Sequence, residues 1–184
     1  MKKRTALISA FLALMPLGKP MVFGTSAFLT SAGLMLSASQ KTYAFSSKFY
    51  FQRANKKAEE GDYSEAIADY TKAIEINPNF AEAYNNRGYT KGDLEDYSGA
   101  IADYTKAIEI NPKYGKAYYN RGYAKGKLRD YSGAISDYTK ALEINPNDVD
   151  AYINRGIDKD NLNDYSGAIA DYNKAIELDP KNSD

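Results

Sequence analysis

The chain contains neither cysteine nor histidine. Without cysteine it can form no disulfide, offers no reactive thiol and lacks the residue that carries a lipoprotein anchor, so its stability depends on packing alone. Without histidine, Ser-His triads, histidine acid–base catalysis and the common metal sites are excluded. No GxGxxG or P-loop motif for binding phosphate is found either. We therefore expect no enzyme, no catalytic residue, no cofactor and no metal.

Acidic residues are missing from the first 44 positions, which carry the basic residues Lys2, Lys3, Arg4, Lys19 and Lys41. Removing this segment changes the balance of 24 basic and 24 acidic residues to 19 basic and 24 acidic, a net charge of about −5 (19 minus 24). A mildly acidic protein has no basic stripe for a phosphate backbone, so we expect no nucleic-acid partner.

The same segment is typical of an export signal. A basic start, an apolar run over 5–17 and small residues up to Ala44 describe a secretory signal peptide, so we place the cleavage after Ala44. This predicts an extracytoplasmic protein, periplasmic or secreted. A second uncharged run, 21–38, has the minimum length of a membrane span, although small polar residues weaken it. Membrane attachment through this run is the alternative, and a buried core helix is a third, for which a repeat array has no need.

The rest of the chain repeats every 34 residues. Position 4 of every unit is tyrosine, positions 20 and 27 are alanine, position 24 is tyrosine and position 32 is proline. A period of this length is typical of arrays of paired helices, in which each pair must stack on its neighbours to bury its apolar faces. We assign the segment 1–44 to the leader and the four units to 47–80, 81–114, 115–148 and 149–182.

Each unit contains two apolar stripes at helical spacing. In the second unit Tyr84 and Gly88 form the first stripe, and Ala100, Tyr104 and Ala107 lie in the second. Offsets of three, four and seven residues place each set on one face of a helix. Short side chains at positions 8, 20 and 27 allow two helices to approach closely, so the unit is predicted to be a helical hairpin.

Helix ends are also marked in the sequence. Asp96 and Ser98 can accept hydrogen bonds from free amides at a helix start, and Asp62 with Glu65 resembles a capping box. The residue before a proline is disfavoured in the helical region, so the second helix should end just before position 32.

These residues resemble the tetratricopeptide repeat (TPR) family. The matching residues of the second unit are Tyr84, Gly88, Ala100, Tyr104, Ala107 and Pro112, and the first unit departs from the pattern only at Ala54. The resemblance covers 136 of the 184 residues, which is four units of 34. It implies an all-α fold, a right-handed superhelical solenoid of antiparallel helix hairpins, in which the first helix of each pair lines a concave groove.

Two positions on the inward stripe carry charge, where the family usually has leucine and tyrosine. Position 7 is arginine and position 11 is lysine in all units, and an inward charge needs a partner. We predict that the aspartate at position 23 binds the arginine between the two helices, in the pairs Arg53–Asp69, Arg87–Asp103, Arg121–Asp137 and Arg155–Asp171. The aspartates at position 16 could take the lysines, namely Asp62, Asp96, Asp130 and Asp164 with Lys57, Lys91, Lys125 and Lys159.

The alternative for the charged positions is a surface pair. Asp103 could pair with Lys106 on its own helix, a contact worth only ~0.3 kcal/mol. A catalytic role is disfavoured because an active site is normally made once, whereas this set recurs in every unit.

Positions that differ between units are expected to determine what the groove binds. We predict that the peptide-binding residues are Phe51, Asn85, Asn86, Tyr89, Tyr119, Asn120, Tyr123, Ile153 and Ile157. An apolar and aromatic groove, with small residues such as Gly92 and Gly126 below it, suits an extended peptide or a partner helix. Asn86, Asn120 and Asn154 could bond the peptide backbone. The alternative is that the tyrosines cover one another between units.

Chaperone-binding members of the family use a carboxylate clamp, which the resemblance allows us to test. That clamp begins with a lysine at position 5 and ends with an arginine at position 6 of the third unit, where this chain has Phe51 and Asn120. Recognition of a free carboxyl terminus is therefore not expected.

Helical arrays usually need a polar cap, and this sequence stops two residues after the fourth unit. We expect Ile169, Tyr172 and Ile176 to face solvent and to support self-association or docking of a partner helix. The sequence as a whole predicts a non-catalytic protein–protein interaction scaffold that binds an unidentified protein or peptide in its groove. A membrane-anchored structural or assembly factor is the alternative.

Overall fold

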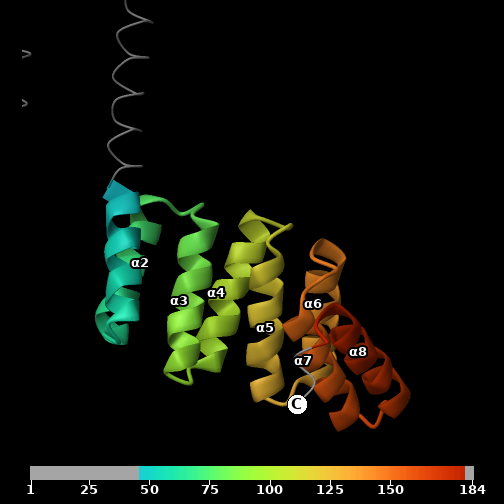
Figure 1. The fold of residues 1–184 in the computed structure, drawn as a ribbon. Coiled ribbons are helices and arrows are strands. Elements are labelled where there is room, and N and C mark those ends of the chain that lie inside the picture. The colour runs from blue at the N-terminus through green and yellow to red at the C-terminus, as the bar shows by residue number, and fades with distance from the viewer. Residues whose placement is uncertain (1–45, 181–184) are drawn as a thin grey trace, which may run out of the picture. The chain divides into compact units, whose positions relative to one another are not determined.

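The computed structural model describes residues 46–180, so the predicted leader 1–44 and its run 21–38 lie outside the described residues. Within 46–180 there are helices and turns and no strand. A helix over 46–59 is followed by α2 (Tyr63–Ile76), α3 (Ala81–Asp93), α4 (Tyr97–Ile110), α5 (Gly115–Lys127), α6 (Tyr131–Ile144), α7 (Val149–Asn161) and α8 (Tyr165–Leu178) (Figure 1).

Aspartate side chains begin the second helices of three units. Asp96 accepts a hydrogen bond from the backbone N–H of Gly99, and Asp130 and Asp164 repeat this bond in their own units. The capping box predicted for the first unit is wrong. Asp62 makes no side-chain cap bond, and the side chain of Glu65 binds the amino group of Lys57 at 2.8 Å instead of the backbone of Asp62.

The two helices of a unit end in different ways. Before each proline the backbone becomes extended, as at Asn77 with φ −129°, which confirms the predicted end of the second helix. The first helices end at a residue in the left-handed region, at position 15 of each unit. This residue is Gly61 in the first unit, with φ 85°, and Glu95, Arg129 and Asn163 in the others, with φ between 61° and 63°. Left-handed residues of this kind commonly terminate helices.

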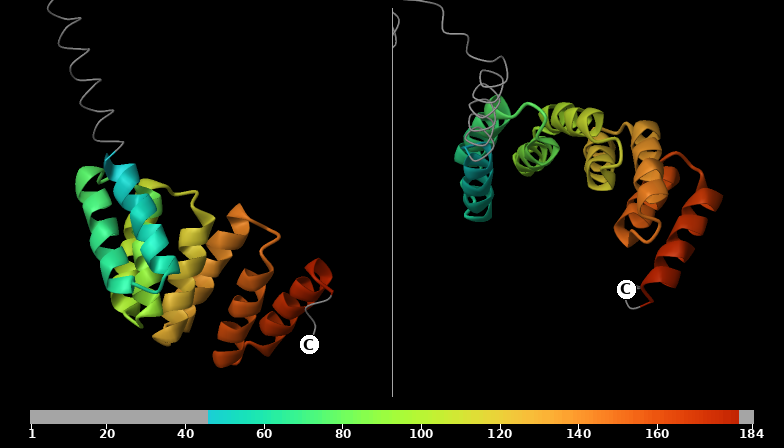
Figure 2. Two further views of the ribbon diagram at one scale, coloured as in Figure 1. Left: turned by 60° about the vertical axis from the view of Figure 1, so that its left-hand side comes forward. Right: turned by 90° about the horizontal axis from the view of Figure 1, so that it is seen from above.

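The way helices contact one another produces the curvature of the array. Each of α2 to α7 packs on the helix that follows it in the chain. In addition α3 contacts α5, and α5 contacts α7, whereas α2, α4, α6 and α8 make no such contacts among themselves. First helices therefore lie close together on the inner side of an arc and second helices spread along its outer side, as Figure 2 shows. The predicted all-α solenoid of helix hairpins is confirmed.

Small residues let the paired helices approach. Ala66, Ala100 and Ala134 are fully buried at position 20. At Gly88 an added Cβ atom would lie 2.9 Å from Cε1 of Tyr104, so a side chain there would displace the ring. The alternation of alanine, glycine and tyrosine is thus the packing of the hairpin itself.

The face of α8 that corresponds to the buried face of α2, α4 and α6 is partly exposed. Ile74, Ile108 and Leu142 are 6–9% exposed at position 28, whereas Ile176 is 47% exposed. Ile169 is exposed as well, but Tyr172 is half-buried, since its ring packs against Gly156. The prediction of a solvent-facing surface therefore holds for the two isoleucines and is wrong for the tyrosine. None of the helices within 46–180 has the length and apolar character needed to cross a bilayer.

Candidate functional site

The charged residues of the inner stripe form one ion-pair network in each unit. Arg87 on α3 donates from Nε to Oδ2 of Asp103 at 2.9 Å and from Nη2 to Oδ1 at 2.6 Å. Nζ of Lys91 lies 2.8 Å from Oδ2 of the same carboxylate, which is almost fully buried. The corresponding pairs Arg53–Asp69, Arg121–Asp137 and Arg155–Asp171 recur, each with its lysine.

One expectation about these charges is wrong, and the alternative of a surface pair is not found. The lysines at position 11 do not bind the aspartates at position 16, because Asp96 and its equivalents Asp130 and Asp164 are engaged at the helix starts and the position-23 carboxylate has room for two cations. The surface pair is not formed either, since Nζ of Lys106 lies 2.8 Å from Glu109.

Each arginine from the second unit onward also bonds the preceding unit. Nη1 of Arg87 donates to Oγ1 of Thr71 at 2.9 Å. Arg121 and Arg155 bond Thr105 and Thr139 in the same way, at 3.1 Å. The arginine therefore joins two helices of its own unit and one of the unit before.

The lowered pKa values of two of its carboxyl groups support a structural role for this network. The hydrogen bond from Arg53 holds the pKa of Asp69 below its usual range. At Asp171 burial acts in the opposite direction, but hydrogen bonds from Arg155 and Lys159 prevail and its pKa is lowered too. A carboxylate that stays ionised and fully paired at neutral pH is suited to stabilising the fold and unsuited to acid–base chemistry.

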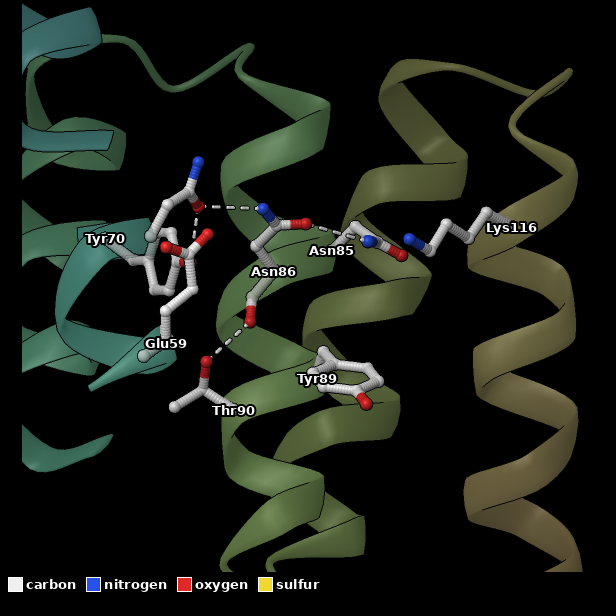
Figure 3. Close-up of a pocket in the computed structure, with 9 residues that line it drawn as sticks. Glu59, Tyr70, Asn85, Asn86, Tyr89, Thr90 and Lys116 are labelled. Atoms are coloured by element: carbon white, nitrogen blue, oxygen red, sulfur yellow. Dashed lines mark hydrogen bonds between the residues drawn. The ribbon is translucent and has the colours of Figure 1, made fainter. Parts of the chain in front are cut away.

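Amide side chains run in a hydrogen-bonded row across the first helices. Tyr70 donates from its hydroxyl to Oδ1 of Asn55, which also accepts from Nδ2 of Asn86 at 3.0 Å. Asn85 donates to Asn86, and Asn120 on α5 donates to Asn85, both at 3.1 Å. Figure 3 shows the part of this row that includes Tyr70, Asn86 and Asn85, with the ring of Tyr89 nearby. The row ties neighbouring units together.

Four of the residues predicted to bind a peptide are largely used inside the protein. Phe51 packs against Phe80, with ring centroids 4.7 Å apart, and belongs to the core between the first two units. Asn85 and Asn120 are buried in the amide row. Tyr119 is half-buried against Tyr138, and its hydroxyl accepts a hydrogen bond from Asn154.

Other predicted residues do face outward. Tyr89 is 55% exposed and Tyr123 is 42% exposed, and Ile157 is exposed as well. Asn86 and Ile153 are half-buried. Tyr119 is thus covered by a tyrosine of its own unit, whereas Tyr89 and Tyr123 stay open, so the alternative that the tyrosines cover one another between units does not describe them.

Three pockets follow one another along the first helices. The first pocket, of about 300 Å³, lies between 46–59 and α3; the second, of about 320 Å³, between α3 and α5; and the third, of about 270 Å³, between α5 and α7. Tyr89 lines both the first and the second, and Tyr123 lines both the second and the third. The two exposed tyrosines thus divide one continuous groove into three compartments.

Acidic residues of the groove were not found by sequence reasoning. Each pocket contains one: Glu59 in the first, Asp93 in the second and Asp158 in the third. The sequence contains one signal for Asp158: position 10 differs in every unit and reads Lys56, Thr90, Ala124 and Asp158. Within 46–180 no group of acidic side chains is arranged to hold a metal ion.

Family models match most of the described chain. A model described as TPR repeat matches residues 54–94, and the model of the tetratricopeptide repeat matches 81–114, 115–148 and 149–182. The chain belongs to the tetratricopeptide repeat family. The boundaries that the family model gives for the last three units coincide with those predicted from the 34-residue period.

Solved structures share the TPR fold. A crystal structure of MamA superposes with a TM-score of 0.71 at 21% identity, covering 88% of this chain and 98% of that one, and shows similarity of fold alone. The Arabidopsis OM64 TPR domain gives 0.63 at 28% identity over 65% and 98%. The first TPR of Spaghetti (RPAP3), bound to the HSP90 peptide SRMEEVD, gives 0.59 at 30% identity over 69% and 95%. No curated protein sequence matches the chain.

Proposed function

We propose that this protein is a non-catalytic interaction scaffold that binds an extended peptide in the groove formed by its first helices. The observation that carries the proposal is the exposure of Tyr89 and Tyr123, which stand between three consecutive pockets. Exposed aromatic rings beside recesses are the usual means by which a groove holds alternate side chains of a bound chain. The similar first TPR of Spaghetti (RPAP3), which is bound to the HSP90 peptide SRMEEVD, supports a peptide as the class of ligand.

The groove is not suited to the free carboxyl terminus that a carboxylate clamp holds. Phe51 occupies the position of the leading lysine and is packed into the core. Asn55 is already bonded to Tyr70 and Asn86, and Asn120 is buried where an arginine would be needed. We therefore propose an internal segment of a partner protein as the ligand.

Display selection tests this proposal. The full chain is used to select random peptides, and each selected peptide is then measured against the variant Tyr89→Ala/Tyr123→Ala. Losing two exposed ring contacts should weaken binding about tenfold or more, since aromatic contacts of this kind carry much of the affinity. Tyr165→Ala, an equally exposed tyrosine on α8 away from the pockets, is the control and should leave affinity unchanged. Equal affinity for all three proteins would refute the groove assignment.

We further propose that the array works outside the cytoplasm, released from a leader cleaved after Ala44. The basic start and the apolar run of the first 44 residues support this. Amino-terminal sequencing of the protein from producing cells distinguishes the alternatives. A start at Phe45 supports export in soluble form, whereas a start at Met1 in a membrane fraction supports attachment through 21–38.

Self-association through α8 is a second proposal, favoured by the exposed Ile169 and Ile176. The residues equivalent to Ile176 are buried in the other units, and those equivalent to Ile169 are half-buried. Sedimentation velocity over a hundredfold range of concentration tests it. Ile176→Lys should abolish any concentration dependence, whereas a wild-type protein that sediments as a monomer throughout would refute it.

A further inference from the structure

The third pocket contains a buried carboxylate without a partner. Asp158 is only 5% exposed, and its side chain makes no hydrogen bond or ion pair with any described residue. The carboxylate lies next to Gly126: a Cβ atom added to this glycine would be 3.1 Å from Oδ2 and 3.4 Å from Oδ1 of Asp158. A buried charge without a partner is destabilising, so its presence calls for an explanation outside the fold itself.

The surroundings of this carboxylate suit a cation. Tyr123 on α5 and Tyr131 and Tyr138 on α6 line the same pocket, and an aromatic face attracts a cation electrostatically. Lys127 shows this within the chain, since its Nζ lies 5.0 Å from the centroid of the Tyr123 ring. That lysine stays with the ring and forms no ion pair with Asp158 within 46–180.

The carboxylate can be reached from the pocket that it lines. Within 46–180 no fully buried side-chain oxygen or nitrogen is left without a partner, so the unpaired oxygens of Asp158 keep an opening to the cavity of about 270 Å³. Gly126 provides this access, because a larger residue at that position would fill the space next to the carboxylate.

The other two pockets also contain a carboxylate beside tyrosine rings, although these carboxylates are exposed. Glu59 lines the first pocket with Tyr70 and Tyr89, and Asp93 lines the second with Tyr97, Tyr104 and other tyrosines. Neither Glu59 nor Asp93 forms an ion pair within 46–180. All three pockets thus combine a carboxylate with tyrosine rings, but of these three carboxylates Asp158 alone is buried, and Lys116 also lines the first pocket.

We propose that the third pocket binds the cationic end of a lysine or arginine side chain from the partner peptide, held by Asp158 and the faces of the surrounding tyrosines. The first and second pockets take further basic side chains of the same peptide. This inference rests on the proposed function and specifies its ligand as a basic segment, opposite in charge to the HSP90 peptide bound by the similar RPAP3 domain.

Helix geometry sets the spacing of those side chains. Consecutive pockets lie on either side of one first helix, and packed helices are separated by roughly 8–10 Å, so we infer a similar spacing between the pockets. A polyproline II segment rises about 3.1 Å per residue with three residues per turn, so every third side chain falls on one face about 9.3 Å apart. The groove therefore fits a peptide with a basic residue at every third position.

Fluorescence polarisation at low salt with a labelled peptide tests the proposal. The probe is acetyl-KPSKPSK-amide, compared with acetyl-KKKPSPS-amide, which has the same composition in another register, and with the acidic SRMEEVD. The full chain should bind the first probe at least about tenfold more tightly than either of the others, because only that peptide aligns its charges with the pockets.

Variants assign the effect to Asp158. Asp158→Asn keeps the shape and removes the charge, and should weaken binding about tenfold; Asp158→Ala, which copies Ala124 in the preceding unit, should do the same. The matched control is Asp160→Asn, a neighbouring exposed aspartate that does not line the pocket. Lys127→Ala should instead strengthen binding, since it removes a positive charge from the site. Circular dichroism checks that each variant is folded.

Several results would overturn the inference. These are equal affinity for the two lysine peptides and the acidic one, equal losses in Asp158→Asn and Asp160→Asn, or no gain in Lys127→Ala. If display selection yields peptides that need Tyr89 and Tyr123 but carry no basic residue, this inference is refuted and the proposed function stands. If neither experiment finds a peptide that depends on the groove, both are refuted.

Discussion

Arg87 on α3 and Asp103 on α4 form a two-point ion pair, with hydrogen bonds of 2.9 and 2.6 Å between the guanidinium and the carboxylate. A third bond, from Nη1 to Thr71, reaches the preceding unit. Paired donors in a fixed fork give both energy and orientation. One arginine per unit therefore sets the angle within a hairpin and the contact between hairpins.

Replacing Asp103 with alanine should be strongly destabilising. The change leaves Arg87 and Lys91 without their shared carboxylate, in a region where both side chains are largely covered. Removing one partner of such a buried network typically costs about 3–5 kcal/mol. Urea unfolding followed by circular dichroism measures the loss. Glu109→Ala, which breaks only the exposed pair with Lys106, should cost less than about 1 kcal/mol, and similar values for the two variants would contradict the assignment.

Thr105→Val separates the contact between units from the contact within a unit. Valine has the shape of threonine but cannot accept the hydrogen bond from Arg121, whose pair with Asp137 stays intact. We expect a loss of about 1 kcal/mol in the free energy of unfolding. Asn173 occupies the same position in the last unit, where no following arginine is described, so Asn173→Ala is the control. A loss in the control as large as that in Thr105→Val would argue against an inter-unit bond.

The period alone was enough to predict the fold, for a physical reason. In a repeat array each contact recurs. The residues at positions such as Tyr104 and Ala100 appear in all four units, the glycine at Gly88 appears in three, and their role can be inferred from their spacing. The Arg–Asp pairs could be predicted for the same reason, because a charge on an inward stripe has few partners within reach.

The exposed surface of the groove was harder to predict, because it depends on the angle between units. Asn85 and Asn120 lie where neighbouring first helices touch, and they bond each other instead of a ligand. Tyr119 is covered by Tyr138 from its own unit. Asp158 could not be singled out because its pocket is formed by residues of two units, and the repeat pattern does not show which residues of different units meet in space.

The left-handed residues that end the first helices offer a stabilising change. Glu95 has φ 61°, a region that costs roughly 1–2 kcal/mol for a residue with a side chain, and the first unit has Gly61 there. Glu95→Gly should therefore stabilise the protein by about 0.5–1 kcal/mol after the greater entropy of glycine in the unfolded chain is subtracted. Thermal unfolding measures the gain. Gly61→Ala should have the opposite sign, and a loss of stability in Glu95→Gly would contradict this reasoning.

Asp158 should make the stability of the protein depend on pH in a direction opposite to that of the paired aspartates. Burial raises the pKa of this carboxyl from 3.8 to about 6. The folded state therefore holds the proton more tightly than the unfolded chain, so the contribution of Asp158 to stability falls as the pH rises from about 4 to about 6 and stays low above that. Two other groups that line its pocket, Lys127 and Tyr138, have pKa values raised further above this range, Lys127 by its hydrogen bond with Tyr123 and Tyr138 by burial.

Asp158→Asn removes this dependence and should be more stable than the wild type by about 1–2 kcal/mol at pH 8, with a smaller difference at pH 5. The measurement is the free energy of unfolding in urea at both pH values. Asp160 is exposed on the same helix. The stability difference between Asp160→Asn and the wild type should be the same at pH 5 and at pH 8. If Asp158→Asn is more stable than the wild type but binds the lysine peptide more weakly, the carboxylate of Asp158 serves binding and lowers the stability of the fold. If the difference between Asp158→Asn and the wild type is the same at pH 5 and pH 8, the carboxylate is not buried as the structure places it.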